Sequence, residues 1–169
     1  KSSWFSLPFD AVADRHKVSQ YFNWTLDELE FAAKCGFDGV CTNEHHQNAY
    51  GFMVNPNMMG SALARATRGT KTAIIQMGET AVFLNPPIRV AEEYAMLDSI
   101  AEGRLVAGFP VGLGGDFAYS YGMAPLEQRA RYVEAHDLIK RAWTAKEQFA
   151  FNGKFYQLPM VNIWPKPMQ

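Results

Sequence analysis

The sequence predicts an α/β protein in which parallel strands alternate with helices, and three observations support this class. Short apolar runs of strand length alternate four times with amphipathic helical patterns along the 169 residues. Glycine or proline stands at most of the junctions, and there is no internal repeat. Such alternation is typical of parallel strands joined by right-handed crossovers. It fits an open doubly wound sheet, and equally the first half of a (β/α)8 barrel, which needs about 250 residues.

Capping signals mark the elements of the first part of the chain. Thr25 and Glu28 form a capping box, and Gly36 is placed to end the helix between them. Asn55 and Pro56 supply a cap and a first-turn proline for the next helix. The expected elements are a strand over 3–9, a polar loop over 10–23, a helix from about Leu26 to Cys35, a buried strand over 37–42 and a helix over 57–68.

Proline and glycine also bound the elements of the second part. Pro86 and Pro87 begin a helix that Gly103 ends, and a long amphipathic pattern follows the next glycine-rich exit. Asn152 and Gly153 are a hairpin signal. The expected elements are a strand over 71–78, a helix over 85–103, a strand over 104–112, a helix over 125–144 and a hairpin segment over 145–169.

Composition argues against several classes of function. The formal net charge is -1, and lysine and arginine form no cluster, so neither nucleic acid nor a membrane surface is expected as a partner. No apolar run reaches the roughly 18 residues of a membrane span. Cys35 and Cys41 show no metal-binding or disulfide pattern, and free thiols indicate a cytoplasmic protein. A small-molecule ligand is the expected partner.

Polar residues gather in loops that follow the strands, where ligands bind in both candidate architectures. The loop over 43–51 holds Glu44, His45 and His46. Adjacent histidines on an extended loop point apart and no HExxH spacing supports them, so no metal site is predicted. Two interpretations stay open for these side chains. They either satisfy backbone groups at the strand end, or at least one histidine serves acid/base chemistry or ligand binding.

Two further features carry weaker signals. The glycines at 112, 114 and 115 would let backbone amides approach a phosphate, but the run lacks the third glycine of a dinucleotide fingerprint. Arg89, in the first turn of its helix, is expected to pair with Glu92 or Glu93 rather than with a ligand. Methionines such as Met77 are interpreted as core-filling residues.

A series of motifs gives a more specific indication. The segments CGFDGVCTNEHH, NPNMMGSALARAT and NPPIRVAEEYAMLDSIAEGRLVAGFPVG, in this order and spacing, closely resemble the N-terminal half of the bacterial luciferase-like flavin monooxygenases. The resemblance runs from about Leu26 to Tyr132. It implies that residues 1–169 are a single partial TIM-barrel domain with strands one to four, and that 145–169 lead toward the second half.

The resemblance implies a chemistry and its partners. Reduced FMN and dioxygen would oxidise a small organic substrate, and a separate flavin reductase would supply the reduced cofactor. The alternatives are an F420-dependent oxidoreductase and a non-catalytic flavin-binding relative. Pairing of such barrels through their second and third helices implies a homodimer, and the small-residue run Gly60–Ala66 suits close helix packing. A core-facing helix would have the same composition.

The resemblance also assigns roles to residues. His45 matches the first histidine of the family's Glu-His-His and is the expected catalytic residue. Glu44 and His46 match its neighbours at the cofactor. Gly78 and Glu79 fall where the family has a non-proline cis peptide bond beneath the flavin ring.

The phosphate end of the cofactor resembles the luciferases less closely. Gly112 is the expected backbone contact to the cofactor there. Pro110 and Val111 stand where the luciferases carry a Cys-Arg pair whose arginine contacts the flavin phosphate, so the resemblance does not extend to that contact.

Overall fold

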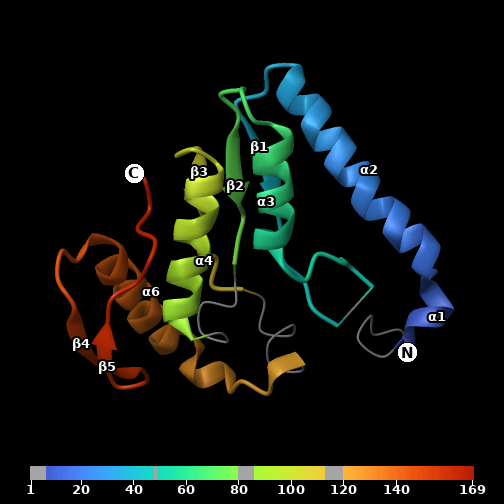
Figure 1. The fold of residues 1–169 in the computed structure, drawn as a ribbon. Coiled ribbons are helices and arrows are strands. Elements are labelled where there is room, and N and C mark those ends of the chain that lie inside the picture. The colour runs from blue at the N-terminus through green and yellow to red at the C-terminus, as the bar shows by residue number, and fades with distance from the viewer. Residues whose placement is uncertain (1–6, 48, 80–85, 113–119) are drawn as a thin grey trace.

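The computed structural model describes residues 7–47, 49–79, 86–112 and 120–169, and it has an α/β fold around a parallel sheet (Figure 1). Parallel strands and helices alternate three times, one fewer than the four alternations expected, because the described part of the chain has no strand over 3–9. In chain order the elements are α1 Phe9–Val12, α2 Arg15–Lys34, β1 Gly39–Thr42, α3 Pro56–Ala66, β2 Ala73–Gln76, α4 Pro87–Ile100, β3 Leu105–Ala107, the 3-10 helix η3 Pro125–Glu127, α6 Gln128–Thr144, β4 Phe149–Asn152 and β5 Gln157–Val161.

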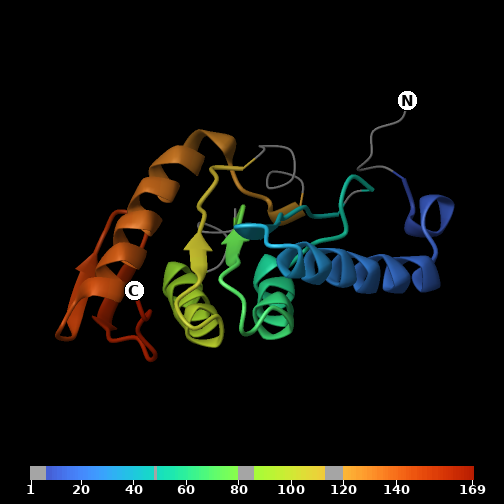
Figure 2. The same cartoon turned by 90° about the horizontal axis from the view of Figure 1, so that it is seen from above.

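The sheet has the order β1-β2-β3, and both pairs of strands are parallel. Helices α3 and α4 lie together on one face of it, while α2 extends to one side and α6 with the β4–β5 hairpin lies on the other (Figures 1 and 2). Ile74 and Gln76 are buried on the helix-covered side, and they alternate with the half-buried Ala73 and Ile75. This period of two is that of a sheet with one fully packed face.

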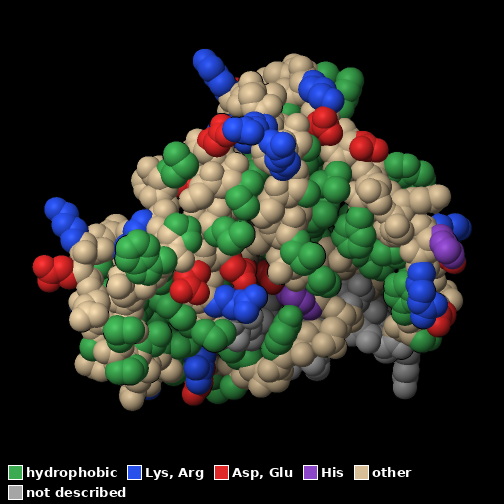
Figure 3. Space-filling model, in the orientation of Figure 1, with side chains coloured by type: hydrophobic (Ala, Val, Ile, Leu, Met, Phe, Trp, Pro, Cys, Tyr) green, Lys and Arg blue, Asp and Glu red, His purple; other side chains and the backbone are tan. Residues whose placement is uncertain are grey.

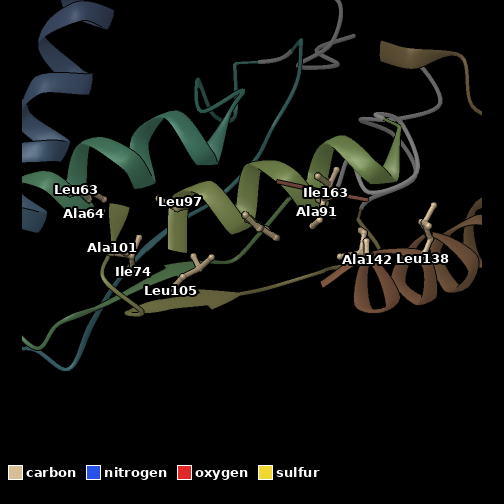
Figure 4. Packing of buried hydrophobic residues seen from close by; sticks show 14 of the residues in the cluster. Leu63, Ala64, Ile74, Ala91, Leu97, Ala101, Leu105, Leu138, Ala142 and Ile163 are labelled. Atoms are coloured by element: carbon tan, nitrogen blue, oxygen red, sulfur yellow. The ribbon is translucent and has the colours of Figure 1, made fainter. Parts of the chain in front are cut away.

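The hydrophobic core lies between β2 and the helices that cover it (Figure 4). Ile74 from the sheet, Leu63 from α3 and Leu97 from α4 are almost completely buried. Leu138 and Ala142 extend the same cluster into α6. Because burial of a leucine or isoleucine side chain contributes roughly 1.5 to 3 kcal/mol, this cluster holds the helices against the strands.

The helix starts at α3 and α4 are those that the sequence predicts. The Asn55 side chain accepts a hydrogen bond of 3.0 Å from the backbone N–H of Met58, and Pro56 is the first residue of α3. Pro87 is likewise the first residue of α4. The predicted strands over 37–42, 71–78 and 104–112 are confirmed, with cores shorter than their apolar runs.

The prediction for the N-terminal part is wrong in two respects. The segment 10–23 is mostly helical, because α2 begins at Arg15 and runs for 20 residues. Its cap is Asp14, whose carboxylate accepts from the backbone N–H groups of His16 and Lys17. Thr25 lies inside the helix, and its hydroxyl donates to the Tyr21 carbonyl instead of capping.

The strand expected over 3–9 falls partly outside the described residues. Residues 1–6 are among those not described, and Phe9 belongs to α1. Within the described ranges, no helix is long and apolar enough to cross a membrane.

The predicted hairpin at the C-terminal end is confirmed, although its turn is longer than two residues. β4 and β5 pair antiparallel, and the N–H of Gly153 donates to the Tyr156 carbonyl at 2.9 Å. Glu134 of α6 accepts hydrogen bonds from the backbone N–H groups of Lys154, Phe155 and Tyr156. The hairpin is therefore fixed to α6 through one carboxylate.

Candidate active site at the carboxyl end of the sheet

The three parallel strands end at the same edge of the sheet, and the chain segments that follow them hold most of the residues predicted for a site. Glu44, His45 and His46 follow β1, and Gly78 and Glu79 follow β2. Figure 3 shows acidic side chains, a cationic side chain and a histidine gathered low on this face, where the strands end. The carboxyl ends of parallel strands are the usual ligand-binding edge of such a sheet.

Glu44 and His46 form a buried pair. Nε2 of His46 lies 2.7 Å from Oε1 of Glu44, and Nδ1 lies 3.0 Å from the hydroxyl of Tyr121. Burial and the nearby Glu44 raise the pKa of Tyr121, so its hydroxyl stays protonated and donates to Nδ1. We assign the imidazole proton to Nε2, because a carboxylate only accepts. These two hydrogen bonds fix the orientation of the His46 ring.

His45 is held differently, and its ring is half-buried. Its backbone N–H donates to the Met53 carbonyl at 2.9 Å, which closes the loop on itself. Its ring lies edge-on to Tyr50 at 4.6 Å between centroids. A Cβ atom on Gly51 would stand 3.1 Å from the ring, so the loop backbone packs directly on the imidazole. The imidazole is thus oriented by its own loop and is partly exposed at the rim.

The backbone after β2 is packed unusually closely. The structure has a non-proline cis peptide bond here, but it joins Met77 to Gly78, one bond before the position predicted at Gly78–Glu79. A Cβ atom on Gly78 would collide with the Gly108 carbonyl oxygen, and one on Gly108 would collide with the Gln76 carbonyl oxygen. Only glycine fits either position, and the two segments meet backbone to backbone. Gly78 is buried and Gly108 is half-buried, and we call their contact the backbone floor.

Met77 is not the core residue that the sequence suggested. Its side chain is 63% exposed beside this floor. The prediction failed because the strand ends at Gln76, so Met77 lies beyond the packed part of the sheet, at its carboxyl edge.

Glu79 is buried and belongs to a second polar network. The Asn57 side-chain amide donates 2.7 Å to Oε2 of Glu79 and 3.0 Å to Oε2 of Glu93. Nε of Arg89 lies 2.7 Å from the other oxygen of Glu93, which confirms the predicted ion pair. The network therefore runs from the exposed guanidinium to the buried carboxylate. Because one amide serves two carboxylates, Asn57 sets the position of Glu79.

Tyr94 connects the ends of two strands. Its fully buried hydroxyl accepts from the N–H of Glu79 at 3.1 Å and donates to the Gly108 carbonyl at 3.0 Å. Burial raises the pKa of Tyr94, and the charge of Glu79 raises it further, so the hydroxyl remains a donor through the neutral range. One side chain of α4 thus holds the segment after β2 against the segment after β3.

Gly112 is described, but its glycine-rich segment is not. It has a φ of +87°, the left-handed region that favours glycine, and the side-chain amide of Gln128 donates to the neighbouring Val111 carbonyl at 2.8 Å. Gly114 and Gly115 lie outside the described residues. Among the described residues there is no group of three His, Cys, Asp or Glu that would hold a metal ion.

Three residues at this edge were missed by the sequence reasoning, namely Asn57, Tyr94 and Tyr121. A signal existed for Asn57, which is a polar residue in the first turn of a helix packed on the sheet. In the sequence, Tyr94 occupies an apolar position of an amphipathic helix. Its hydroxyl reaches its two backbone partners only because β2 and β3 end side by side. Tyr121 lies far from His46 in sequence, and no local pattern joins them.

The chain is similar to known proteins in sequence and in fold. The family model described as luciferase-like monooxygenase matches residues 2–169. Over 170 aligned residues, the chain is 31% identical to the oxygenase component of the flavin-dependent trigonelline monooxygenase of Acinetobacter baylyi. That alignment covers 95% of this chain and 44% of the relative, so the chain spans less than half the length of this relative.

Solved structures share the fold. The monooxygenase RslO1 of Streptomyces bottropensis superposes with a TM-score of 0.80 at 31% identity, over 89% of this chain and 45% of that one. The oxygenating constituent of 3,6-diketocamphane monooxygenase of Pseudomonas putida, solved with FMN, gives a TM-score of 0.74 at 22% identity over 82% and 38% of the two chains.

Proposed function

The chain belongs to the luciferase-like monooxygenase family, and we propose that it forms the cofactor-binding part of an enzyme that oxidises a small organic substrate with reduced FMN and dioxygen. The observation that carries the proposal is the edge where three strands end. There, a backbone floor at Gly78 and Gly108 lies on the same rim as His45 and the Glu44–His46 pair.

The described residues fit a flat aromatic cofactor. Glycine at 78 and at 108 lets the two segments pack without side chains between them, and Gly108 is partly exposed, so a planar ring would lie against the backbone there. The exposed Met77 side chain adds an apolar surface beside it. When bound, the flavin supplies the redox chemistry, and the protein binds it, orients it and excludes water. Gly112 lies on the same edge, where it would contact the cofactor through its backbone.

His45 is the catalytic residue in this proposal. Histidine is the side chain that most often serves as a general acid or base in enzymes. The half-buried ring of His45 is held by Tyr50 and Gly51, so it is placed to give or accept a proton at the rim. Glu44 and His46 have a supporting role, because His46 is bonded through both ring nitrogens. Glu79 completes the wall behind the floor, where Asn57 holds it.

The half-barrel architecture is also part of the proposal. Cys41, Ile75 and Val106 stand in register across the three strands, on the face away from α3 and α4. Cys41 and Val106 are exposed and Ile75 is half-buried. An apolar row of this kind needs a cover, and closure of the sheet into a (β/α)8 barrel supplies one.

We further propose a cytoplasmic homodimer that receives reduced flavin from a separate reductase. Trp24 and Phe31, seven residues apart on α2, are 62% and 68% exposed, and they give this helix an apolar outer face. The run Gly60–Ala66 supports the core-facing alternative instead, since Gly60, Leu63 and Ala64 are buried within the chain. The proposed pairing surface is therefore α2.

The first experiment is a titration of the purified protein with FMN, followed by flavin fluorescence. Saturable binding is expected, and a parallel titration with F420 tests the alternative cofactor. The second experiment follows reoxidation of bound reduced FMN by dioxygen in His45→Ala. Loss of an acid/base group is expected to slow a proton-dependent step by about 10² to 10⁴-fold.

The matched control is His16→Ala, which removes an exposed histidine of α2. It should leave FMN affinity, reoxidation and unfolding unchanged. If His45→Ala reoxidises bound flavin at the rate of the wild type, His45 is not the catalytic residue. If the protein does not bind FMN or F420 at all, the proposed function is wrong.

A further inference from the structure

A cavity of about 330 Å³ lies beside the loop that carries His45. One wall is α1, with Phe9 and Val12, together with Ala13 just after it, and the other is the loop itself, with Phe52 and Val54. The cavity is separate from the floor at Gly78, because none of the described residues that line it follows β2 or β3. Its volume is at the lower end of the range found for small-molecule sites.

The chemistry of the lining selects a class of ligand. The described lining residues include no charged side chain, and Gln47 is the one polar side chain among them. The Gln47 amide donates to the Ser120 carbonyl at 3.3 Å, so one of its hydrogens is already used. Entry of an ion into such a lining leaves its charge without a partner, which costs far more than entry of a neutral apolar molecule.

Apolar side chains around the cavity remain exposed in the protein itself. Phe9 is 41% exposed, Val12 49% and Val54 57%. Two segments that are distant in sequence, α1 and the loop, present this apolar surface to each other across a gap instead of closing on it. A ligand between them would cover surface that the chain leaves in water.

The position of the cavity connects it to the rim. Gly51 is part of its lining, and a Cβ atom on the same glycine would stand 3.1 Å from the His45 ring. One residue of backbone therefore separates the cavity from the proposed catalytic side chain. A molecule with its apolar body in the cavity would reach past Gly51, which has no side chain to block it, toward His45.

We propose that this cavity binds the apolar body of a neutral organic substrate and that it discriminates against charged molecules. The proposal rests on the proposed function, because it names the substrate class of the same site. It assigns the specificity to α1 and the loop, and it leaves cofactor binding to the ends of β2 and β3.

The test measures binding without flavin, so that it stands apart from the oxygenase activity. Camphor, a neutral cyclic ketone, and benzoate, a charged ring, are titrated into the purified protein by isothermal calorimetry. Camphor is expected to bind and benzoate to bind at least about tenfold more weakly. In Val12→Asp, a carboxylate enters the lining, and the affinity for camphor should fall by about tenfold or more.

Val133→Asp is the matched control, because Val133 on α6 is also 49% exposed and lies outside the cavity. It should bind camphor as the wild type does. Ala13→Phe is a second, uncharged variant that fills the cavity and should also abolish binding, with circular dichroism to show that both cavity variants are folded.

The outcomes separate the two proposals. Camphor binding without FMN binding would support the cavity and reject the proposed function. FMN binding without camphor binding, or camphor binding that Val12→Asp and Ala13→Phe leave intact, overturns the inference about the cavity.

Discussion

Replacement of Tyr94 with phenylalanine removes a single buried hydroxyl and tests the connection between the ends of β2 and β3. The ring stays, so its packing against Phe109 and Trp143 is kept. Two hydrogen bonds are lost, one to the N–H of the buried Glu79 and one to the carbonyl of the half-buried Gly108. A buried backbone group without a partner costs about 1 to 3 kcal/mol. Because the half-buried Gly108 carbonyl costs less than the buried N–H of Glu79, the expected loss is about 2 to 4 kcal/mol.

Urea unfolding followed by circular dichroism measures this loss, with Tyr21→Phe as the control. Tyr21 is 42% exposed on α2, and removal of its hydroxyl should change the free energy of unfolding by no more than about 0.5 kcal/mol. If Tyr94→Phe unfolds with the same free energy as Tyr21→Phe, the hydroxyl does not bridge the two segments and does not fix the backbone floor.

The same variant makes a prediction in alkaline solution. Burial raises the pKa of Tyr94 above 10 in the folded state, so between pH 10 and its folded pKa the folded chain holds a proton that the unfolded chain releases. The stability that the protonated Tyr94 hydroxyl contributes is therefore fully present below pH 10 and is lost as the pH rises toward the folded pKa. The wild type should therefore lose about 1.4 kcal/mol per pH unit above pH 10 more than Tyr94→Phe does. Parallel curves for the two proteins would refute the assignment.

Two further predictions concern the scaffold and the assembly. Arg104 donates hydrogen bonds to the carbonyls of Ala101, Thr72 and Ala64 and to a threonine hydroxyl, so Arg104→Lys should lower the free energy of unfolding in urea by about 2 to 4 kcal/mol. The control Arg68→Lys, at an exposed ion pair, should lower it by no more than about 0.5 kcal/mol, and equal effects would show that the Arg104 hydrogen bonds do not stabilise the fold. Trp24→Asp places a charge on the outer face of α2 and should convert a dimer to a monomer in sedimentation equilibrium, and a wild-type protein that sediments as a monomer would reject the proposed pairing.

The sequence predicted the sheet and its covering helices because their signals are local. Asn55 and Pro56 begin α3 as expected, since a cap needs only the residues next to it. The prediction for the N-terminal part failed for a related reason, because both Asp14 and Thr25 carry a local capping signal and only one of them begins the helix. Asp14 caps a helix that continues through Thr25, so the later signal became an interior position.

The site was predictable only as a set of loops. Glu44, His45, His46 and Glu79 lie at the expected edge, because strand order alone brings the carboxyl ends together. The contacts between these loops were not predictable. Tyr121 reaches His46 over 75 positions of sequence, and neither residue carries a pattern that points to the other.

At this edge, a side chain of each covering helix contacts the segment that follows the next strand in the chain. Asn57 lies on α3, which follows β1, but it holds Glu79 after β2. Tyr94 lies on α4, which follows β2, but its hydroxyl donates to Gly108 after β3. Each β/α unit therefore positions part of the site of its neighbour. If the proposed FMN site is correct, substitutions on the buried faces of α3 and α4 should alter FMN affinity without any contact to the cofactor. Their effects should be non-additive wherever two of them act on Glu79.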